Sequence, residues 1–351
     1  SLFVTSLNSG SNGNCYYIGN HDEAVLIDAG LSCRETERRM KRLGLSMHKV
    51  KAIFITHEHT DHIYGVSRLS KKYQLPVYIT EGTRNNHRLH FQQHLPVSFQ
   101  PYKPIEVGSL TVTAFPKFHD AADPHSFVVA GNGVQVGVFT DIGRPCEHLI
   151  AHFKQCDAAF LESNYDEEML ETGGYPQRLK DRIRGGSGHL SNTQALALFT
   201  RHRSAQLTHL FLSHLSANNN CPRLAQDMFN AVAGKTEIIL APRTQETAVY
   251  HITNAPIRLG RAVKSKVAEE QLSLFSTNTF FRKIHFLNPF VCCWKREVHF
   301  FFPAVHVLFP PHPPKLHLQL EVATKPDSLI LEDYFSSFSV VVYIDYVYQG
   351  L

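Results

Sequence analysis

His57-Glu58-His59-Thr60-Asp61-His62 gathers three imidazoles and the carboxylate of Asp61 within six positions. The preceding stretch, Ala52-Ile53-Phe54-Ile55-Thr56, is apolar and predicts a buried strand. Residues two apart in extended backbone point to the same side, as His57 and His59 would, while Asp61 and His62 come from the turn into a helix. Such a cluster after a buried strand indicates a metal site, and its spacing leaves room for two ions.

The composition is that of a globular protein. Of the 351 residues, 43% are hydrophobic and 19% are charged, which is enough for one large core or two smaller ones. The net charge of +4 permits a nucleic-acid partner without requiring one. Seven cysteines without regular spacing argue against a disulfide framework and favour a reducing, cytoplasmic location. We see neither a secretory leader nor an apolar stretch long enough to cross a membrane.

Up to about residue 252 the chain alternates short apolar strands, turns and amphipathic helices, which is an α/β pattern. Strands are expected at 2–7, 15–19, 24–28, 52–56, 76–80, 109–115, 126–130, 134–140, 157–161, 208–213 and 236–240. Helices are expected at 33–43, 61–73, 191–202 and 222–233. We therefore assign residues 1–252 to one catalytic domain.

Residues 253–351 form a tail of a different character, with aromatic and proline clusters that follow neither a strand nor a helix period. Two hypotheses remain open for this tail. It is either non-native sequence translated beyond a natural stop, or a small interaction domain with an unfamiliar pattern.

Three later strand ends supply further metal-ligand side chains. His119, Asp141 and His214 each close an apolar run. A carboxylate such as that of Asp141 can bridge two ions through its two oxygens. His125 is the nearest rival to His119 as a ligand, but it does not end a strand.

In this order the motifs resemble those of the metallo-β-lactamase superfamily, over about residues 1–252. The resemblance implies an αββα sandwich with the site at one edge of two facing sheets. It also implies two divalent metal ions, for which Zn, Mn and Fe are equally suitable. One ion would be held by His57, His59 and His119, the other by Asp61, His62 and His214, with Asp141 bridging them.

Finer motifs resemble the YycJ/WalJ-type members of that superfamily. They are Ser9–Asn14, His119–Pro124, Glu162–Asp166, Gly188–Asn192 and Leu212–Asn219. The resemblance implies a cytoplasmic bacterial DNA exonuclease of DNA repair or replication. Tyr165 departs from the pattern, because a histidine is expected there, and this puts one contact behind the metal ligands in doubt. The span from Asp141 to His214 is too short for the β-CASP insertion of RNase J-type enzymes.

A phosphate-binding segment is expected beside the metal site. Ser191-Asn192-Thr193-Gln194 is a capping box that opens a helix, and free amides at a helix start attract anions. The preceding basic run includes Arg182 and Arg184, which alone would be a solvated helix face. Together these features favour a nucleic-acid substrate, with Ser191, Asn192, Arg182 and Arg184 in contact with its phosphates.

The implied chemistry is in-line hydrolysis of a phosphodiester by hydroxide that two metal ions generate. Asp61 would orient or deprotonate the attacking water. His189 would protonate or stabilise the leaving oxygen, or would serve only as a hydrogen-bond donor to the phosphate.

The tail contains Gln271-Leu272-Ser273-Leu274-Phe275, which resembles the peptide with which bacterial DNA-processing enzymes bind the sliding clamp. A chance match of so short a peptide is an equally good interpretation. If it is functional, Gln271, Leu272, Leu274 and Phe275 would bind the clamp and tether the protein to DNA.

Two other functions remain open. The same two-metal core supports hydrolysis of a small ester, thioester or β-lactam. A third hypothesis is a metal-dependent DNA adaptor without catalytic activity. The complete set of metal ligands argues against it.

Overall fold

The computed structural model describes residues 1–86, 89 and 91–254. The predicted clamp-binding peptide and the interpretation of the tail beyond residue 254 fall outside these residues. Within them, none of the helices has the length and apolarity needed to cross a bilayer. All five cysteines in this part of the chain are free.

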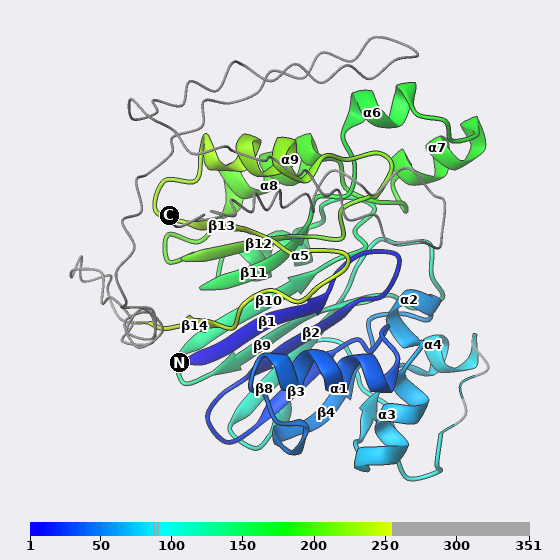
Figure 1. Cartoon of the computed structure of the whole chain (residues 1–351), viewed down its shortest axis with the longest axis vertical. Coiled ribbons are helices and arrows are strands. Elements are labelled where there is room, and N and C mark those ends of the chain that lie inside the picture. The colour runs from blue at the N-terminus through cyan, green and yellow to red at the C-terminus, as the bar shows by residue number, and fades with distance from the viewer. Residues whose placement is uncertain (87–88, 90, 255–351) are drawn as a thin grey trace, which may run out of the picture. The chain divides into compact units, whose positions relative to one another are not determined.

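Two seven-stranded sheets form the centre of the fold (Figure 1). The first has, in spatial order, β14 (Tyr250–Ile252), β1 (Leu2–Asn8), β2 (Cys15–Gly19), β3 (Ala24–Ile27), β4 (Val50–Phe54), β5 (Val77–Tyr78) and β6 (Pro96–Val97). The second has β13 (Glu237–Leu240), β12 (His209–Ser213), β11 (Ala158–Glu162), β10 (Val134–Phe139), β9 (His125–Gly131), β8 (Leu110–Pro116) and β7 (Ile105–Val107). Both sheets mix parallel and antiparallel neighbours.

Helices form the outer layers. On the N-terminal side the helical segments are α1 (Cys33–Arg42), η1 (Met47–Lys49), α2 (Thr60–Ile63), α3 (Val66–Tyr73) and α4 (Glu81–Asn85). The later ones are α5 (Glu147–Phe153), α6 (Glu167–Thr172), α7 (Gln177–Arg184), α8 (Asn192–His202) and α9 (Pro222–Asn230).

Three apolar cores separate the layers. The central core joins the inner faces of the two sheets, for example where the rings of Tyr16 and Phe160 lie 4.8 Å apart. A second core lies between the first sheet and helices α1 and α3. The third lies between the second sheet and helices α5, α8 and α9, where Phe199 packs on Phe229. The predicted αββα arrangement is confirmed.

Tertiary contacts alter two of the predicted elements. The strand expected at 52–56 pairs only over Val50–Phe54, and its last residues continue towards the site. The helix expected at 61–73 is broken into α2 and α3 at Gly65. The amide of Gly65 donates to Ala29 O at 2.8 Å, and a Cβ there would lie 1.9 Å from Leu31 O. Helices α4 to α6 and strands β6, β7 and β14 were not predicted, while α7 contains the basic run with Arg182 and Arg184.

The strand directions bring the predicted ligands to one edge. Strands β8 and β10 both run antiparallel to β9, and β12 is parallel to β11 and β10. Their carboxyl ends therefore share an edge of the second sheet, where they lead into His119, Asp141 and His214. In Figure 1, α6 and α7 lie above this end of the strands and α2 and α4 below it.

Gly30 offers a test of how tightly the first metal-ligand loop is packed. A Cβ at Gly30 would lie 1.6 Å from Asp61 O and 2.6 Å from Asn14 N. We expect Gly30→Ala to lower stability by about 1–3 kcal/mol, because the backbone must move. The melting temperature should fall by about 2–4 °C per kcal/mol in a domain of this size.

Gly174→Ala is the matched control, since a Cβ there has no neighbour within 4 Å. Thermal unfolding followed by circular dichroism measures both variants. Equal melting temperatures for Gly30→Ala and wild type would contradict the packing described for this loop.

Candidate metal centre

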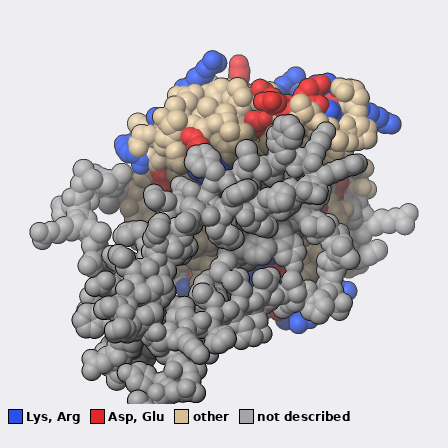
Figure 2. Space-filling view, turned by 45° about the horizontal axis from the view of Figure 1, so that its top comes forward, with Lys and Arg blue, Asp and Glu red and all other residues tan. Residues whose placement is uncertain are grey.

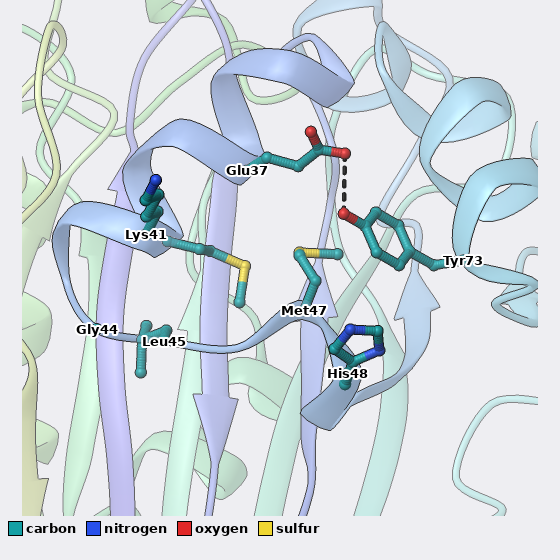
Figure 3. Close-up of a pocket in the computed structure, with 8 residues that line it drawn as sticks. Glu37, Lys41, Gly44, Leu45, Met47, His48 and Tyr73 are labelled. Atoms are coloured by element: carbon teal, nitrogen blue, oxygen red, sulfur yellow. Dashed lines mark hydrogen bonds between the residues drawn. The ribbon is translucent and has the colours of Figure 1, made fainter.

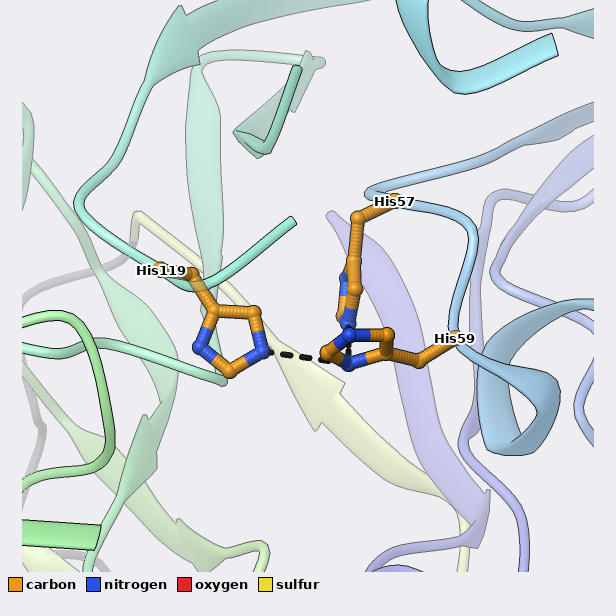
Figure 4. Close-up of side chains that lie close together, drawn as sticks. All are labelled: His57, His59 and His119. Atoms are coloured by element: carbon orange, nitrogen blue, oxygen red, sulfur yellow. Dashed lines mark hydrogen bonds between the residues drawn. The ribbon is translucent and has the colours of Figure 1, made fainter. Parts of the chain in front are cut away.

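Three histidine rings from two separate loops converge at the sheet edge (Figure 4). His57 and His59 follow β4, and His119 follows β8. His57 Nε2 lies 3.0 Å from His59 Nδ1, which is 3.3 Å from His119 Nε2. The outer nitrogen of His119 lies 3.0 Å from the carbonyl oxygen of Gly188, to which it donates. The inner nitrogen of His119 therefore carries a lone pair directed at the other two rings.

Asp61, His62 and His214 form a second group beside the first. Asp61 Oδ2 lies 3.4 Å from His62 Nε2 and 3.6 Å from His214 Nε2. Asp141 lies between the groups. Its oxygens are 3.2 Å from His62 Nε2, 3.4 Å from His214 Nε2 and 3.8 Å from His119 Nε2.

These separations suit a binuclear metal centre. Four ligands at about 2.1 Å from a tetrahedral ion lie about 3.4 Å from one another, close to the observed spacing of the nitrogens and oxygens. His214 Nε2 and Asp141 Oδ2 are buried and have no hydrogen-bond partner among the described residues. Unpartnered buried polar atoms are costly unless something else satisfies them. The donor set therefore fits two divalent ions.

The electrostatic environment divides the histidines into two kinds. Burial lowers the pKa of His57 well below its usual value and that of His119 to about 3, so both rings are neutral. Burial also disfavours charge on His214, but Asp141, Asp61 and Glu162 outweigh it and raise its pKa to about 10. Asp141 is ionised, because His214 and His62 overcome the effect of burial and hold its pKa well below the usual range. The ionised carboxylate of Asp141 thus gives the centre a negative charge that a bound cation would balance.

Asp28 supports His62 from behind. Its carboxylate is fully buried and lies 2.7 Å from His62 Nδ1. The amide and hydroxyl of Thr56 donate to the same carboxylate at 2.8 and 2.9 Å. A carboxylate bonded in this way fixes the ring orientation and tautomer of a ligand histidine.

Glu162 has the same supporting position on the second sheet. Its buried carboxylate accepts from the amides of Ile142 and Leu190 at 2.8 and 3.0 Å. It also lies 2.8 Å from His189 Nδ1 and 3.1 Å from His214 Nδ1. Glu162, His189, Asp141 and His214 are close enough to form a ligand group. Because the amides and imidazoles already occupy the oxygens of Glu162, it is better suited to orient the histidines than to bind an ion.

Sequence reasoning assigned no role to Asp28 or Glu162. The sequence feature that could have indicated both residues is a charged side chain at the end of an otherwise apolar strand. Buried carboxylates are rare in such places unless they are paired. Asp28, Asp141 and His214 also have positive φ values of 61°, 55° and 55°. Backbone of this kind in residues other than glycine is uncommon and is found at functional sites.

The predicted phosphate-binding side chains are only partly brought to the centre. The capping box is confirmed, but Ser191 and Asn192 are buried, and their side chains bond to Glu167 and Ser163. Because both side chains are buried and hydrogen-bonded within the protein, their predicted direct contact with a phosphate is not supported.

The two predicted arginines differ in position. Arg182 pairs with Asp120, whose carboxylate lies 3.5 Å from His119 Nε2, so Arg182 belongs to the rim of the centre. Arg184 instead pairs with Asp181 and Glu171. Figure 2 shows acidic and basic side chains lying side by side on the visible surface at the top of the molecule.

Neither His125 nor Tyr165 belongs to the ligand groups found among the described residues. His119 rather than His125 lies in the histidine cluster. His125 packs against Phe99 instead, with the ring centroids 5.4 Å apart. Tyr165 is buried, and its carbonyl accepts from the Asn192 amide at 2.8 Å.

A pocket of about 430 Å³ lies elsewhere, on the outer layer around α1 and η1 (Figure 3). There the carboxylate of Glu37 accepts from the hydroxyl of Tyr73 at 2.9 Å and from Lys72 at 2.6 Å. The metal-ligand groups found among the described residues include no side chain of this pocket. The histidine and aspartate cluster is therefore the candidate active site.

Residues 23–214 match the family model described as the beta-lactamase superfamily domain. The chain belongs to the metallo-β-lactamase superfamily. With this cluster of buried histidines and aspartates, it is a metal-dependent hydrolase of that superfamily. The predicted resemblance to YycJ/WalJ-type members is also confirmed by the relatives.

Exodeoxyribonuclease YycJ of Bacillus anthracis is 36% identical to the chain over 229 residues, which are 64% of this chain and 86% of that protein. Exodeoxyribonuclease WalJ of Streptococcus pneumoniae is 32% identical over 236 residues, 65% of this chain and 87% of the relative. Among solved structures, the metallo-β-lactamase-fold protein YhfI of Bacillus subtilis superposes with a TM-score of 0.55 at 17% identity. That superposition covers 70% of this chain and 98% of YhfI, and it supports the fold alone.

Asp28→Asn tests the support behind His62. The variant keeps the size of the side chain but removes the charge, so we expect metal affinity to fall by roughly 10- to 100-fold. Competition with a chromogenic chelator measures the affinity. Asp227→Asn, at an exposed carboxylate of α9, is the control and should bind metal like wild type. Unchanged affinity in Asp28→Asn would exclude the supporting role.

Proposed function

We propose that the protein is a metal-dependent phosphodiesterase that degrades DNA as an exonuclease. The observation that carries this proposal is the similarity to two proteins named exodeoxyribonucleases, which extends over 86% and 87% of their lengths. The cluster at the sheet edge is compatible with it, because buried carboxylates and imidazoles can hold two ions of the kind that hydrolyse phosphoesters. A role in DNA repair or replication would follow from such an activity.

In this proposal His57, His59 and His119 would hold one divalent ion. Asp61, His62 and His214 would hold the other, and the carboxylate of Asp141, which lies between the two groups, would be shared. When bound, the two ions would lower the pKa of a water molecule and neutralise charge on the attacked phosphate. Zn, Mn and Fe all suit this donor set.

Asp61 is placed to orient the attacking water. It is the most exposed of the cluster carboxylates, with 20% of its side chain accessible, against 2% for Asp141. The side-chain amide of Asn14 donates to Asp61 Oδ2 at 3.1 Å and fixes the carboxylate. Burial disfavours its charge, but His62 and His214 hold its pKa below the usual range. An ionised, partly accessible carboxylate can accept a proton or a hydrogen bond from water.

His189 is placed to serve the leaving group. Its Nδ1 lies 2.8 Å from the buried carboxylate of Glu162, which fixes the ring. About a fifth of the side chain is accessible, at 19%, and the ring stacks on His214 with centroids 5.2 Å apart. The other ring nitrogen can then donate a proton to the oxygen that departs from phosphorus.

Asp141→Ala tests the centre as a whole. It removes the carboxylate that faces both groups, so we expect metal-dependent hydrolysis of DNA to be abolished. The assay uses end-labelled single- and double-stranded DNA and RNA, with Mn and Zn compared. Nitrocefin and a glutathione thioester are included because the fold also supports hydrolysis of small esters, thioesters and lactams. Full nuclease activity in folded Asp141→Ala, or turnover of the small substrates alone, would refute the proposal.

His189→Ala tests the proton donor separately. We expect kcat on DNA to fall by roughly 10²- to 10⁴-fold while the bound metal content is unchanged, because the ring contributes to proton transfer rather than to metal binding. Metal analysis of the purified variant checks the second part. His21→Gln, in the exposed turn between β2 and β3, is the control. Wild-type kcat in His189→Ala would remove His189 from the reaction.

A further inference from the structure

Phe118 and Arg144 form a stacked pair that neither the sequence motifs nor the metal ligands account for. The guanidinium carbon of Arg144 lies 3.9 Å from the centroid of the Phe118 ring. Phe118 is 41% exposed and is the only exposed phenylalanine in the described part of the chain. It precedes the proposed metal ligand His119, and Arg144 follows Asp141 by three positions. The pair therefore lies on loops that end in the metal centre.

Backbone contacts hold these loops together. The amide of Gly143 donates to Phe118 O at 2.6 Å. A Cβ at Gly143 would lie 2.4 Å from Ser187 Cα and 2.5 Å from Gly186 O, so the loop after β10 is packed against the turn that precedes His189. The loops that carry the stacked pair are thereby held against the turn before His189 and next to the proposed metal ligands His119 and Asp141.

Arg144 also differs from the arginines that the sequence singled out. Arg182 and Arg184 pair with carboxylates. For Arg144, the described residues supply neither an ion pair nor a side-chain hydrogen bond, and the side chain is exposed. Its donors are therefore available, and a guanidinium matches the geometry of a phosphate.

The exposed ring of Phe118 therefore lies beside a guanidinium that has no ion-pair partner among the described residues. Bases of single-stranded nucleic acid stack on aromatic rings and on guanidinium planes, while arginine binds the backbone phosphates. We infer that Phe118 and Arg144 bind the nucleotide next to the scissile phosphate at a DNA end, with its base on the exposed surface of the stack and its phosphate on Arg144. This inference rests on the proposed nuclease function.

Stacking of a base on Phe118 and Arg144 would give the enzyme a substrate preference. A base inside a duplex is already stacked on its neighbours and cannot reach a protein ring without unpairing. A single-stranded or frayed end presents its bases freely. We therefore expect single-stranded ends to be degraded with a lower KM than blunt duplex ends.

The test compares two substrates, an ordinary oligonucleotide and one whose terminal nucleosides are abasic at the end that the enzyme degrades. In wild type the abasic end should raise KM by about tenfold, the usual effect of losing one stacked base. Phe118→Ala should raise KM by a similar factor on the ordinary end and should no longer distinguish the two substrates. Arg144→Gln should reduce the slope of log KM against log salt by about 0.7, the contribution of one phosphate contact in a single strand.

Arg201→Gln is the matched control. Arg201 is another exposed arginine without an ion pair in the described structure, and it lies in the last turn of α8, at the far end of that helix from His189. It should keep wild-type KM and salt dependence. Melting temperatures of all variants confirm that they are folded.

The outcomes separate this inference from the proposed function. If wild type degrades DNA and Phe118→Ala still distinguishes ordinary from abasic ends as wild type does, the stacking pair is excluded and the nuclease function stands. If wild type degrades no DNA, both proposals fall.

Discussion

The cost of burying charge controls the organisation of this sheet edge. Asp28, Asp141 and Glu162 are almost completely inaccessible, and an unpaired carboxylate in such a place would be strongly destabilising. Each of these carboxylates lies within contact distance of imidazoles or accepts hydrogen bonds from backbone amides. Lys117, also buried, adds a positive charge nearby, and its ammonium donates to Thr140 O at 2.7 Å. Strand ends, loop conformations and histidine orientations are all arranged so that these carboxylates are compensated.

The same constraint explains why the site is so rigidly supported. The candidate ligand side chains come from both sheets, and several of the histidines that face the centre have a partner on the other ring nitrogen, such as Gly188 O for His119 or Asp28 for His62. Left-handed backbone at Asp28, Asp141 and His214 turns the chain sharply at the ends of strands. Side chains that are already in position need little reorganisation when a cation binds.

The residues that converge at the candidate metal centre could be predicted from sequence because each is local, either within the His57–His62 motif or at the end of an apolar run. The contacts between different segments of the chain could not be predicted from sequence. Arg182 and Arg184 belong to a basic helix in sequence, but Asp120 and Glu171 from other segments pair with them. Gly65 breaks an amphipathic pattern only because Leu31 O approaches it. The pairing of Phe118 with Arg144 joins loops 26 positions apart and has no signature in either.

Strand β14 has a consequence of another kind. Tyr250–Ile252 pairs with β1, with Leu2 opposite Ile252, and so covers what would otherwise be the open border of the first sheet. A shortened form of the protein that ends before these residues would expose the unpaired amides and carbonyls of β1. Uncovered strands recruit strands from other molecules. In the described part of the chain, the three residues of β14 thus replace the seven-residue edge of β1 by a much shorter one, which reduces the tendency of the sheet to pair with other molecules.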